Sequence, residues 1–384
     1  MASDITSGNA VNLINAIESL SAKVHTQSLD LSFNELLDMY QNNELNITPD
    51  YQRLFQWSEG ASSRFIESLL LEMPVPPIYV VEEDNGKYLL IDGLQRISSY
   101  LHLRGELEAL HLESPIKKGE KLTFVDCDIV TELNGENFDS LGTALQIRLK
   151  RAFVRVEVVR KGSDSRFKYH MFKRLNNGGT VLSSQQIRNC TIRLLDPEFN
   201  DFIGHLSNLE VFKNCVENIS KEQKLAFFDQ ELILRFFAFK NYREKYTHDI
   251  ADYLTEYMEA VSETDTDKKI AFDYEAEERI FTKTFTIFDK TLRELSFGYA
   301  NKTRDKITGG FGVYHFEAFT LGIQNALEHI DTTNDSLMEK LKETFKEIKL
   351  DEHFYQITTG GGKNSRGPLR DRIEFVQNKI EEVL

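Results

Sequence analysis

The sequence predicts an α+β protein, with a small mixed α/β domain at residues 1–190 and a mostly helical domain at residues 191–384. Three observations lead to this fold class. The chain has 384 residues, more than the ~100–200 typical of one domain. Strand-like runs are concentrated in the first half. From about residue 191 onward, apolar residues recur mainly at the spacing of amphipathic helices.

The first half mixes helix-like and strand-like segments. Helical spacing of apolar residues predicts helices within 9–20, 56–72 and 166–174. In the second of these, Arg64 and Glu67 stand three residues apart, which predicts a surface ion pair. Short runs rich in β-branched and aromatic residues predict strands at 78–81, 87–91 and 152–159.

The second half carries long helical patterns at 221–241, 249–263, 273–295 and 336–349. The stretch 358–368 is rich in Gly, Ser and Thr, and residues 363–372 include four basic residues. We interpret this stretch either as a flexible loop or as a second phosphate contact.

Composition and charge narrow the class of protein. Hydrophobic residues make up 41% and charged residues 28%, no apolar run could cross a bilayer, and the first twenty residues lack the pattern of a secretion signal. We therefore expect a soluble, cytoplasmic protein without membrane contact. The net charge of −15 argues against indiscriminate binding to nucleic-acid phosphates, so any such contact must be local.

The segment 88–100, Tyr-Leu-Leu-Ile-Asp-Gly-Leu-Gln-Arg-Ile-Ser-Ser-Tyr, predicts a strand, a tight turn and a helix start. Gly93 favours the turn because glycine readily adopts positive backbone angles. The N-terminus of a helix is an anion site, to which Arg96 adds a charged fork and Gln95 a neutral donor. Asp92 is a candidate metal ligand. The alternative is that Asp92 and Gly93 merely close a turn and Arg96 is solvated.

A second polar cluster, Pro49–Trp57, ends in the single tryptophan of the chain. Arg53 is a candidate phosphate ligand, while Tyr51 or Trp57 would stack on a base or pack over a pocket. With Gln52, these residues form a second candidate nucleotide-binding group. The alternative is a loop held in place by aromatic packing.

A third cluster spans 174–188. Ser183 or Ser184 predicts a helix N-cap, with Gln186 near capping-box spacing and Ile187 beginning the helix. An ordinary capped helix explains these residues, but not the amides and glycines before them, which suit a base edge, a ribose or a phosphate. The candidate nucleotide-binding residues here are Asn176, Asn177, Gly178 and Gly179.

The segment from Arg148 to Arg174 contains ten Lys or Arg residues and only two acidic residues, Glu157 and Asp164. This local excess of positive charge in an acidic protein predicts a surface that faces nucleic acid or nucleotide, although a solvated basic face explains it equally well. The candidate nucleic-acid-binding residues are Arg148, Lys150, Arg151 and Arg155.

The usual signatures of catalysis are mostly absent. The sequence has no Gly-x-x-x-x-Gly-Lys-Ser/Thr loop, no His-Glu-x-x-His, no Gly-x-Ser-x-Gly and no His and Asn set of the HNH type. Its three cysteines, Cys127, Cys190 and Cys215, are widely spaced, which favours buried thiols over a disulfide or a zinc site.

In their order along the chain, the three clusters resemble the N-terminal domain family of GmrSD-type restriction endonucleases. Where that family has Asp-Gly-Gln-Gln-Arg after a strand, this chain has Asp-Gly-Leu-Gln-Arg at 92–96 and departs only at Leu94. The later family pattern, an Asn near glycines and then Leu-Ser-x-Gln/Glu-Ile-Arg, matches residues within 176–188. Segments 49–57 and 69–79 support the resemblance.

The resemblance implies a core similar to the ParB and sulfiredoxin folds. It also implies a domain that binds, and often hydrolyses, a nucleoside triphosphate in prokaryotic defence against phage or foreign modified DNA. An HNH-type nuclease, fused or separately encoded, is the partner that the family implies. Sulfiredoxin-like chemistry is disfavoured because it needs a cysteine in the turn, where this chain has Leu94 and Gln95.

Our leading hypothesis is a nucleotide switch that depends on Mg²⁺ or Mn²⁺. Arg96 and the helix N-terminus would hold the phosphates, Gln95 would orient water or a phosphate oxygen, and Asp92 would coordinate the metal directly or through water. Arg53 would add charge from across the cleft. Two alternatives are a non-catalytic DNA-recognition subunit and a metal-dependent nuclease. The sequence leaves a homo-oligomer open.

Overall fold

The computed structural model describes residues 12–384 with short gaps. Residues 1–11, 16, 20, 22, 48–54, 84, 111, 113, 176–182, 194, 248, 264–266 and 268 lie outside the described part. The chain forms two compact units, Met1–Leu182 (unit 1) and Ser183–Leu384 (unit 2). The sequence-based division places the first eight residues of unit 2 in the N-terminal domain. The α+β class is confirmed, with a mixed sheet in unit 1 and helices in unit 2.

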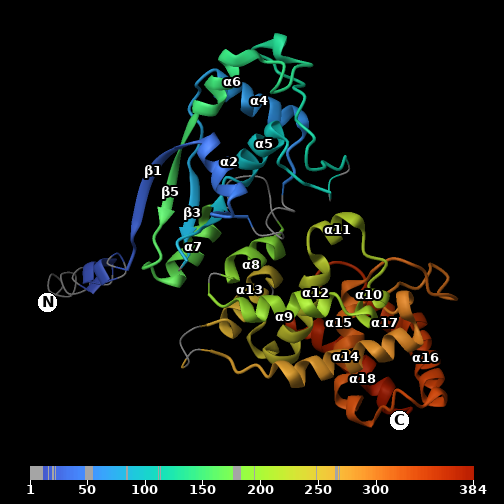
Figure 1. Ribbon diagram of the computed structural model, residues 1–384. Coiled ribbons are helices and arrows are strands. Elements are labelled where there is room, and N and C mark those ends of the chain that lie inside the picture. Colours follow the sequence, from blue (N-terminus) through green and yellow to red (C-terminus); the bar gives the residue numbers. More distant parts are fainter. Residues whose placement is uncertain are drawn as a thin grey trace. The chain divides into compact units, whose positions relative to one another are not determined.

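Unit 1 is built on a five-stranded mixed sheet in the order β1-β5-β3-β4-β2 (Figure 1). β1 runs antiparallel to β5, β5 is parallel to β3, β3 is antiparallel to β4, and β4 is parallel to β2. The strands are β1 (Thr26–Ser32), β2 (Leu45–Asn46), β3 (Ile78–Glu82), β4 (Tyr88–Asp92) and β5 (Phe153–Val159).

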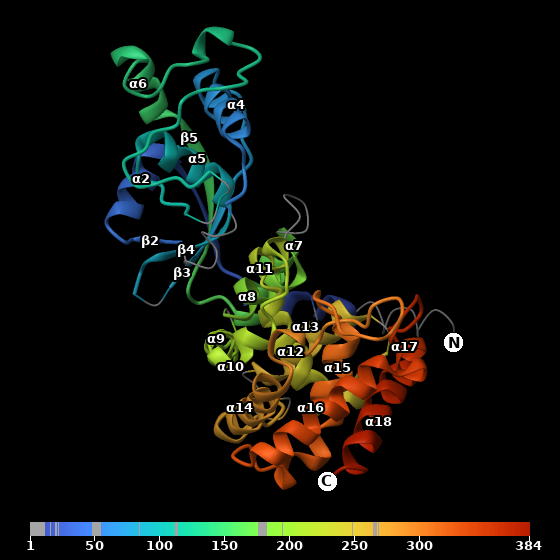
Figure 2. The ribbon, with the colours of Figure 1, turned by 90° about the vertical axis from the view of Figure 1, so that its right-hand side faces the viewer.

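Helices of unit 1 cover the apolar face of this sheet (Figures 1 and 2). In β5, Val154, Val156 and Val158 are buried between the outward residues Phe153 and Arg155, as expected for a strand with one covered face. The helices are α2 (Phe33–Gln41), α4 (Glu59–Leu70), α5 (Leu94–Arg104), η1 (Thr131–Leu133), α6 (Gly142–Arg151) and α7 (Ser165–Leu175).

The regular elements in the described part of unit 2 are all helices, apart from an isolated β-bridge between Ala300 and Ile307. Its central helix, α12, buries every residue from Leu232 to Phe239. Phenylalanines of α14 pack against Phe236 of this helix, and Phe212 of α10 packs against α14 in turn. The elements are α8 (Ser184–Ile192), α9 (Pro197–Ser207), α10 (Glu210–Cys215), α11 (Lys221–Leu225), α12 (Phe228–Asn241), η3 (Arg243–Lys245), α13 (Ile250–Val261), α14 (Tyr274–Thr291), η4 (Arg293–Leu295), α15 (Val313–Gly322), η5 (Gln324–His329), α16 (Asp335–Leu350), α17 (Glu352–Thr358) and α18 (Arg366–Glu381).

The structure confirms the predicted strands to within a residue or two, and adds β1, β2 and α2, which the sequence patterns do not indicate. The helix predicted at 221–241 is interrupted. Phe227 has a φ of +56°, a left-handed backbone angle that ends α11 before α12 begins. Cys127 and Cys215 are buried free thiols, as expected. Among the described helices, none is long and apolar enough to cross a membrane.

Candidate functional site

The junction between β4 and α5 depends on Gly93. This residue is the N-cap of α5 and has a φ of +106°, a backbone angle that residues with a Cβ atom rarely adopt. A Cβ atom there would lie 2.8 Å from Cγ1 of Ile78, closer than such contacts allow. The predicted strand, turn and helix are all confirmed, and Gly93 contributes no capping side chain to the first turn of α5.

Asp92 and Arg96 form an ion pair at this junction. Nη2 of Arg96 donates to Oδ2 of Asp92 at 2.7 Å and to the backbone oxygen of Pro77 at 2.9 Å. The side chains are 14% and 32% exposed for Arg96 and Asp92. Nε of Arg96 is buried and has no hydrogen-bond acceptor among the described residues. Asp92 and Pro77 therefore hold the guanidinium of Arg96 in place through Nη2, while its Nε has no acceptor among the described residues.

Gln95 ties the second cluster to the same junction. Its Oε1 accepts from the backbone N–H of Gln56 at 3.1 Å and of Trp57 at 3.2 Å. Trp57 is half-buried and packs edge-on against Phe65 of α4, with ring centroids 5.8 Å apart. The carbonyl end of the Gln95 side chain thus positions the backbone that leads into α4.

Strand topology also directs β2, which precedes the second cluster in the sequence, toward this junction. β2 is parallel to β4, with Asn46 opposite Leu89, so both strands point toward the edge of the sheet where Gly93 lies. The described chain resumes at Phe55, which is buried. Tyr51, Gln52 and Arg53 themselves lie outside the described residues.

The third cluster falls at the boundary between the two units. Asn176, Asn177, Gly178 and Gly179 lie outside the described residues. The predicted capping box is confirmed, because Ser183 Oγ accepts from the backbone of Gln186 while the Gln186 side chain accepts from the backbone of Ser183.

Residues 33–193 match the family model described as the GmrSD restriction endonuclease N-terminal domain. This region is therefore similar to the GmrSD N-terminal domain. The match covers the β4–α5 junction and the third cluster, and it relates the chain to restriction systems. No curated protein and no solved structure gives a significant match to the chain.

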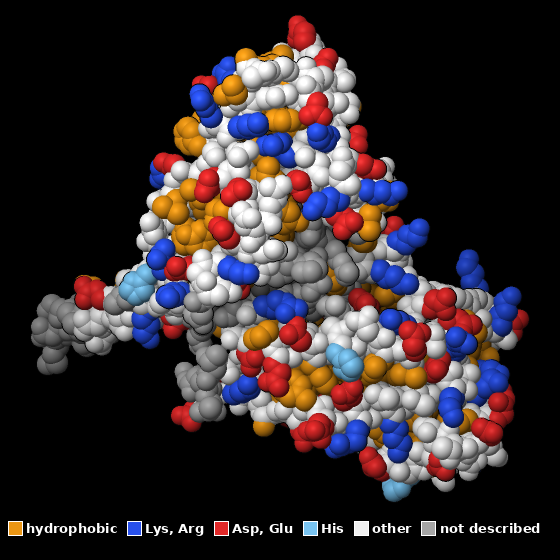
Figure 3. Space-filling model, in the orientation of Figure 1, with side chains coloured by type: hydrophobic (Ala, Val, Ile, Leu, Met, Phe, Trp, Pro, Cys, Tyr) orange, Lys and Arg blue, Asp and Glu red, His pale blue; other side chains and the backbone are white. Residues whose placement is uncertain are grey.

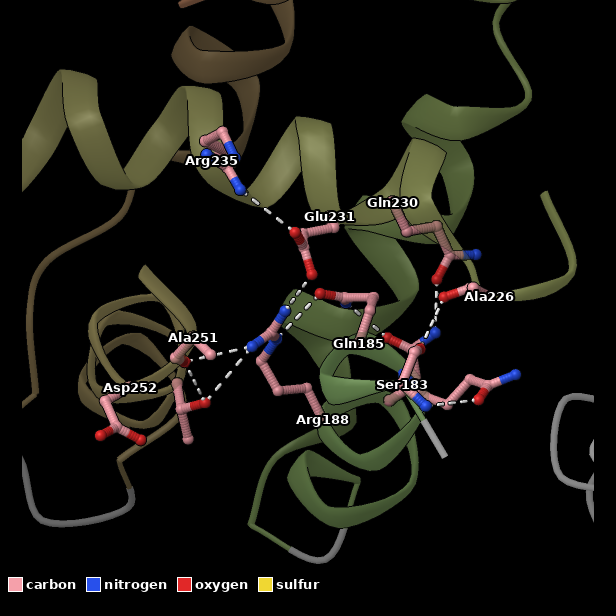
Figure 4. A network of polar contacts seen from close by, with 12 residues as sticks. Ser183, Gln185, Arg188, Ala226, Gln230, Glu231, Arg235, Ala251 and Asp252 are labelled. Carbon is pink, nitrogen blue, oxygen red and sulfur yellow. Dashed lines mark hydrogen bonds and ion pairs between the residues drawn. The ribbon is translucent and has the colours of Figure 1, made fainter. Parts of the chain in front are cut away.

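Arg188, the last residue of the pattern shared with the GmrSD family, is a structural residue here (Figure 4). It is 2% exposed, and its Nη2 pairs with Oε2 of Glu231 in α12 at 2.7 Å. Its Nε donates to Gln185 at 2.9 Å, and Nη1 donates to the backbone oxygen of Ala251 at 3.2 Å.

The end of the matched region, residues 183–193, therefore belongs to unit 2 and is held by contacts within it. Ser183 Oγ donates to the backbone oxygen of Ala226 at 2.8 Å, and Gln186 Nε2 donates to that of Leu225 at 2.9 Å. With Arg188, these contacts fix α8 to α11 and α12. No local signal in the sequence distinguishes such an arginine from a ligand-binding one.

Of the four predicted nucleic-acid ligands, Arg148, Arg151 and Arg155 line one groove of about 730 Å³ between α6 and the start of β5, here called the β5–α6 groove. Two of them are paired. Arg148 lies 3.0 Å from Glu72 and Arg155 lies 2.7 Å from Asp30, contacts that the local sequence does not reveal.

These ion pairs offset much of the local positive charge that the sequence predicts. The hydrogen bond with Asp30 is the main cause that raises the pKa of Arg155, so this exposed arginine stays charged. Lys150 is not among the residues that line the groove, and its Nζ lies 5.9 Å from the ring centroid of Phe138. Binding of nucleic acid by these four residues stays a prediction.

The predicted ion pair between Arg64 and Glu67 is wrong. Glu67 is 1% exposed, and its Oε1 accepts from the backbone N–H of Ile129 at 3.2 Å and of Val130 at 2.6 Å. Arg64 instead donates to the backbone oxygen of Asp126 at 3.3 Å. Both side chains hold the loop before η1, because Glu67 pairs with two of its backbone donors and Arg64 with one of its backbone acceptors.

The described residues contain no group of three or more His, Cys, Asp or Glu side chains that could hold a metal ion. At the β4–α5 junction, Asp92 offers one carboxylate, of which Oδ2 is paired with Arg96. One or two carboxylates are enough for Mg²⁺ when phosphate oxygens and water complete its shell. The donor set thus fits a metal that arrives with a nucleotide rather than one bound by protein alone.

Proposed function

We propose that the GmrSD domain binds a nucleoside triphosphate at the N-terminus of α5 and hydrolyses its terminal phosphate bond with Mg²⁺ or Mn²⁺. The observation that carries this proposal is the β4–α5 junction, where Gly93 opens the helix without a capping side chain and Arg96 lies in its first turn. A helix N-terminus with an arginine beside it attracts phosphate through its dipole, its backbone N–H groups and a planar charged fork.

Arg96 would bind phosphate while keeping its present contacts. Its Nη2 is occupied by Asp92 and Pro77, whereas its buried Nε lacks an acceptor among the described residues. An unsatisfied donor next to a helix N-terminus favours an incoming oxygen, because a buried unpaired polar atom costs about 1–3 kcal/mol. The ion pair with Asp92 would hold the guanidinium in place before the nucleotide arrives.

Asp92 would hold the metal through its second carboxylate oxygen, Oδ1, directly or through water. A bound Mg²⁺ or Mn²⁺ would neutralise charge on the phosphates. In the hydrolysis itself, a water oxygen bonds to the terminal phosphorus, and the bond from that phosphorus to the bridging oxygen breaks. The bridging oxygen leaves with the nucleoside diphosphate, and the proton that the water loses passes to solvent as inorganic phosphate forms. Such phosphoryl transfer needs positioning and charge neutralisation rather than a protein nucleophile.

Gln95 would act as a positioning residue. Its two hydrogen bonds to the backbone at 56–57 keep the end of the second cluster beside the junction. Arg53 and Tyr51, the predicted ligands from this cluster, lie outside the described residues. Within a restriction system, the domain would act as the nucleotide-dependent component, with cleavage supplied by a separate nuclease of the HNH type. The pairing of Arg148 and Arg155 with carboxylates favours this function over DNA recognition as the primary role.

The proposal is tested by thermal unfolding and phosphate release. Purified protein should unfold at a higher temperature when Mg²⁺ and one or more nucleoside triphosphates are present. At a nucleotide concentration of 100 Kd, binding should raise the free energy of unfolding by about 2.7 kcal/mol. It should also release inorganic phosphate. The absence of any shift with all common nucleoside triphosphates, in either Mg²⁺ or Mn²⁺, contradicts the proposal.

Arg96→Ala should abolish the shift and lower phosphate release at least tenfold, because it removes the charged group at the helix N-terminus. Arg104→Ala is the matched control. Arg104 lies in the last turn of the same helix and donates to Asn34 at 2.9 Å, so its loss perturbs the helix without touching the junction. Each variant is compared with its own nucleotide-free melting temperature, and an equal loss of the shift in both contradicts the role of Arg96.

A further inference from the structure

A β-bulge lies directly before Asp92 in β4. Tyr79 of β3 is paired with Asp92, whereas the next residue of β3, Val80, is paired with Leu90. At this point β4 therefore has one residue more than β3, which is Ile91. Leu90 and Ile91 are both buried, at 2% and 0% exposure. Bulges often re-aim a side chain beside an active site, and here the side chain that follows the bulge is that of Asp92.

The bulge decides which face of the sheet Asp92 occupies. In a regular strand, Asp92 would lie on the same face as Leu90, which is buried beneath the helices of unit 1. Because Asp92 is instead the partner of Tyr79, it shares the face of Tyr79, as directly opposite residues of antiparallel strands do. The tyrosine is half-buried, while its neighbours Ile78 and Val80 are fully buried on the other face.

A row of polar side chains continues from Asp92 and Tyr79 across two further strands. Tyr79 is paired with Glu157 of β5, and Glu157 with Ser28 of β1. Ser28 Oγ donates to Oε2 of Glu157 at 2.6 Å. No described residue forms a hydrogen bond with Oε1 of Glu157 or with the hydroxyl of Tyr79. Two half-buried side chains beside the β4–α5 junction thus keep atoms that can bind a ligand.

This row marks the border between a covered and an open part of the sheet face. Val81 and Val159, two residues beyond Tyr79 and Glu157 on the same face, are buried at 4% and 1% exposure. In the other direction, Arg155 is exposed. A ligand held at Asp92 can therefore extend over Tyr79 toward Glu157 without entering the apolar core.

The spacing of the row suits the two ends of a nucleotide. Asp92 and Glu157 are two strands apart, which is roughly 10 Å at ~4.8 Å per strand. A carboxylate repels phosphate groups at short range, so Glu157 suits the uncharged sugar rather than the triphosphate. Carboxylates bind ribose hydroxyls in other nucleotide sites, and an aromatic ring between the two carboxylates offers a packing surface for the sugar.

The surrounding charge does not by itself favour one sugar over another. Figure 3 shows acidic and basic side chains interspersed over the face of unit 1 that it presents, rather than one wide area of a single sign. Recognition of the uncharged part of a ligand therefore depends on single groups placed within hydrogen-bond reach.

We propose that Glu157 accepts a hydrogen bond from the ribose 2′-hydroxyl of the bound nucleotide, with Tyr79 packed beneath the sugar. The site would then prefer ribonucleoside triphosphates over their 2′-deoxy forms. The inference rests on the nucleotide binding proposed above and names the class of nucleotide. Glu157 acts as a specificity residue, because it contacts a group that the two classes of nucleotide do not share.

The test measures the affinity of the full chain for matched pairs of nucleotides by calorimetric titration with Mg²⁺. Each pair is a ribonucleoside triphosphate and its 2′-deoxy form with the same base. The wild type should bind the ribonucleotide at least about tenfold more tightly, since the deoxy form lacks a hydrogen bond to a charged group. Glu157→Ala should weaken ribonucleotide binding by that factor and leave the deoxy form within about twofold, which abolishes the preference.

Three further variants separate recognition of the hydroxyl from a structural role. Glu157→Gln should keep part of the preference, because an amide oxygen still accepts a hydrogen bond. Tyr79→Ala should weaken both members of a pair by the same factor, since the ring packs against the sugar in either form. Asp30→Ala is the matched control. Asp30 is a carboxylate on the same face, one row from Glu157, and pairs with Arg155, so its loss should leave the preference unchanged.

The outcomes distinguish this inference from the proposed function. Equal affinities of the wild type for both members of every pair overturn the inference and leave nucleotide binding standing. Failure of every triphosphate to bind overturns both. A preference that persists in Glu157→Ala, or that Asp30→Ala removes as well, overturns the role of Glu157.

Discussion

Replacing Glu317 by glutamine should lower the free energy of unfolding of unit 2 by about 3–5 kcal/mol, the cost of breaking a buried ion pair. Glu317 in α15 is 2% exposed and accepts from Nη1 of Arg235 at 2.6 Å, while its Oε2 pairs with Arg372 of α18. The substitution removes the negative charge that compensates two buried guanidinium groups. The measurement is denaturant unfolding followed by helical circular dichroism, with hydrogen exchange to locate the lost protection.

The matched control is Glu339→Gln on the surface of α16. Glu339 is 64% exposed and pairs with Lys342 at 3.1 Å, so its neutralisation should change stability by less than about 1 kcal/mol. The amides of α12, α15 and α18 should lose protection in the Glu317 variant and keep it in the control. Similar losses in both variants would contradict the structural role of the buried pair.

This expectation follows from a chain of ion pairs within unit 2, in which Glu231 is half-buried and the other four side chains are buried. Arg188, Glu231, Arg235, Glu317 and Arg372 alternate in sign and join α8, α12, α15 and α18. Burial by itself lowers the pKa of an arginine, but the two glutamates outweigh it and raise that of Arg235. The three arginines and two glutamates carry a net positive charge. Loss of either carboxylate therefore leaves a guanidinium group poorly compensated and lowers the free energy of unfolding.

The sequence predicts the β4–α5 junction because its signals are local. A run of apolar residues ends at Ile91, Asp92 and Gly93 form a turn, and helical spacing resumes within two residues. Each step depends on neighbours in the chain. The left-handed φ of Gly93 and the helix from Leu94 follow from the same residues.

Long-range contacts explain what the sequence does not predict. β1 alternates few apolar residues with Thr, Gln, Ser and Asp, and it becomes a strand because it pairs along its whole length with β5, more than a hundred residues later. Arg188 and Glu231 are 43 residues apart, so the pattern around Arg188 gives no indication of its partner. Glu67 likewise meets backbone donors more than sixty residues away.

Replacing Lys349 by methionine should raise the free energy of unfolding at pH 7 by roughly 1–3 kcal/mol, the scale for relieving a poorly compensated buried polar group. Lys349 in α16 is 1% exposed, and among the described residues no carboxylate pairs with it. Its Nζ contacts the backbone oxygen of Gly298 at 3.1 Å, Nδ1 of His315 at 3.4 Å and the ring of Phe319 at 4.5 Å. Methionine has similar length and fills the space without a charge.

The pH dependence of stability separates this explanation from better packing alone. Burial lowers the pKa of Lys349 well below its ordinary value of 10.5, so the unfolded chain binds more protons there and stability rises with pH up to about that value. Lys349→Met should lose this rise. Burial and Lys349 lower the pKa of His315 below 6.5, so stability falls as pH drops below that value, and less steeply in the variant.

Urea unfolding between pH 5 and about pH 10 measures both effects, with Lys346→Met on the same helix as the control. Lys346 is 38% exposed and pairs with Glu343 at 2.7 Å, so its loss should change stability little and leave the pH dependence unchanged. If the stability of Lys349→Met still rises with pH up to about 10, a group other than Lys349 causes that rise. A less stable variant would show that the contacts of Lys349 with Gly298 and His315 outweigh the cost of burying its amine, because methionine leaves both without a partner.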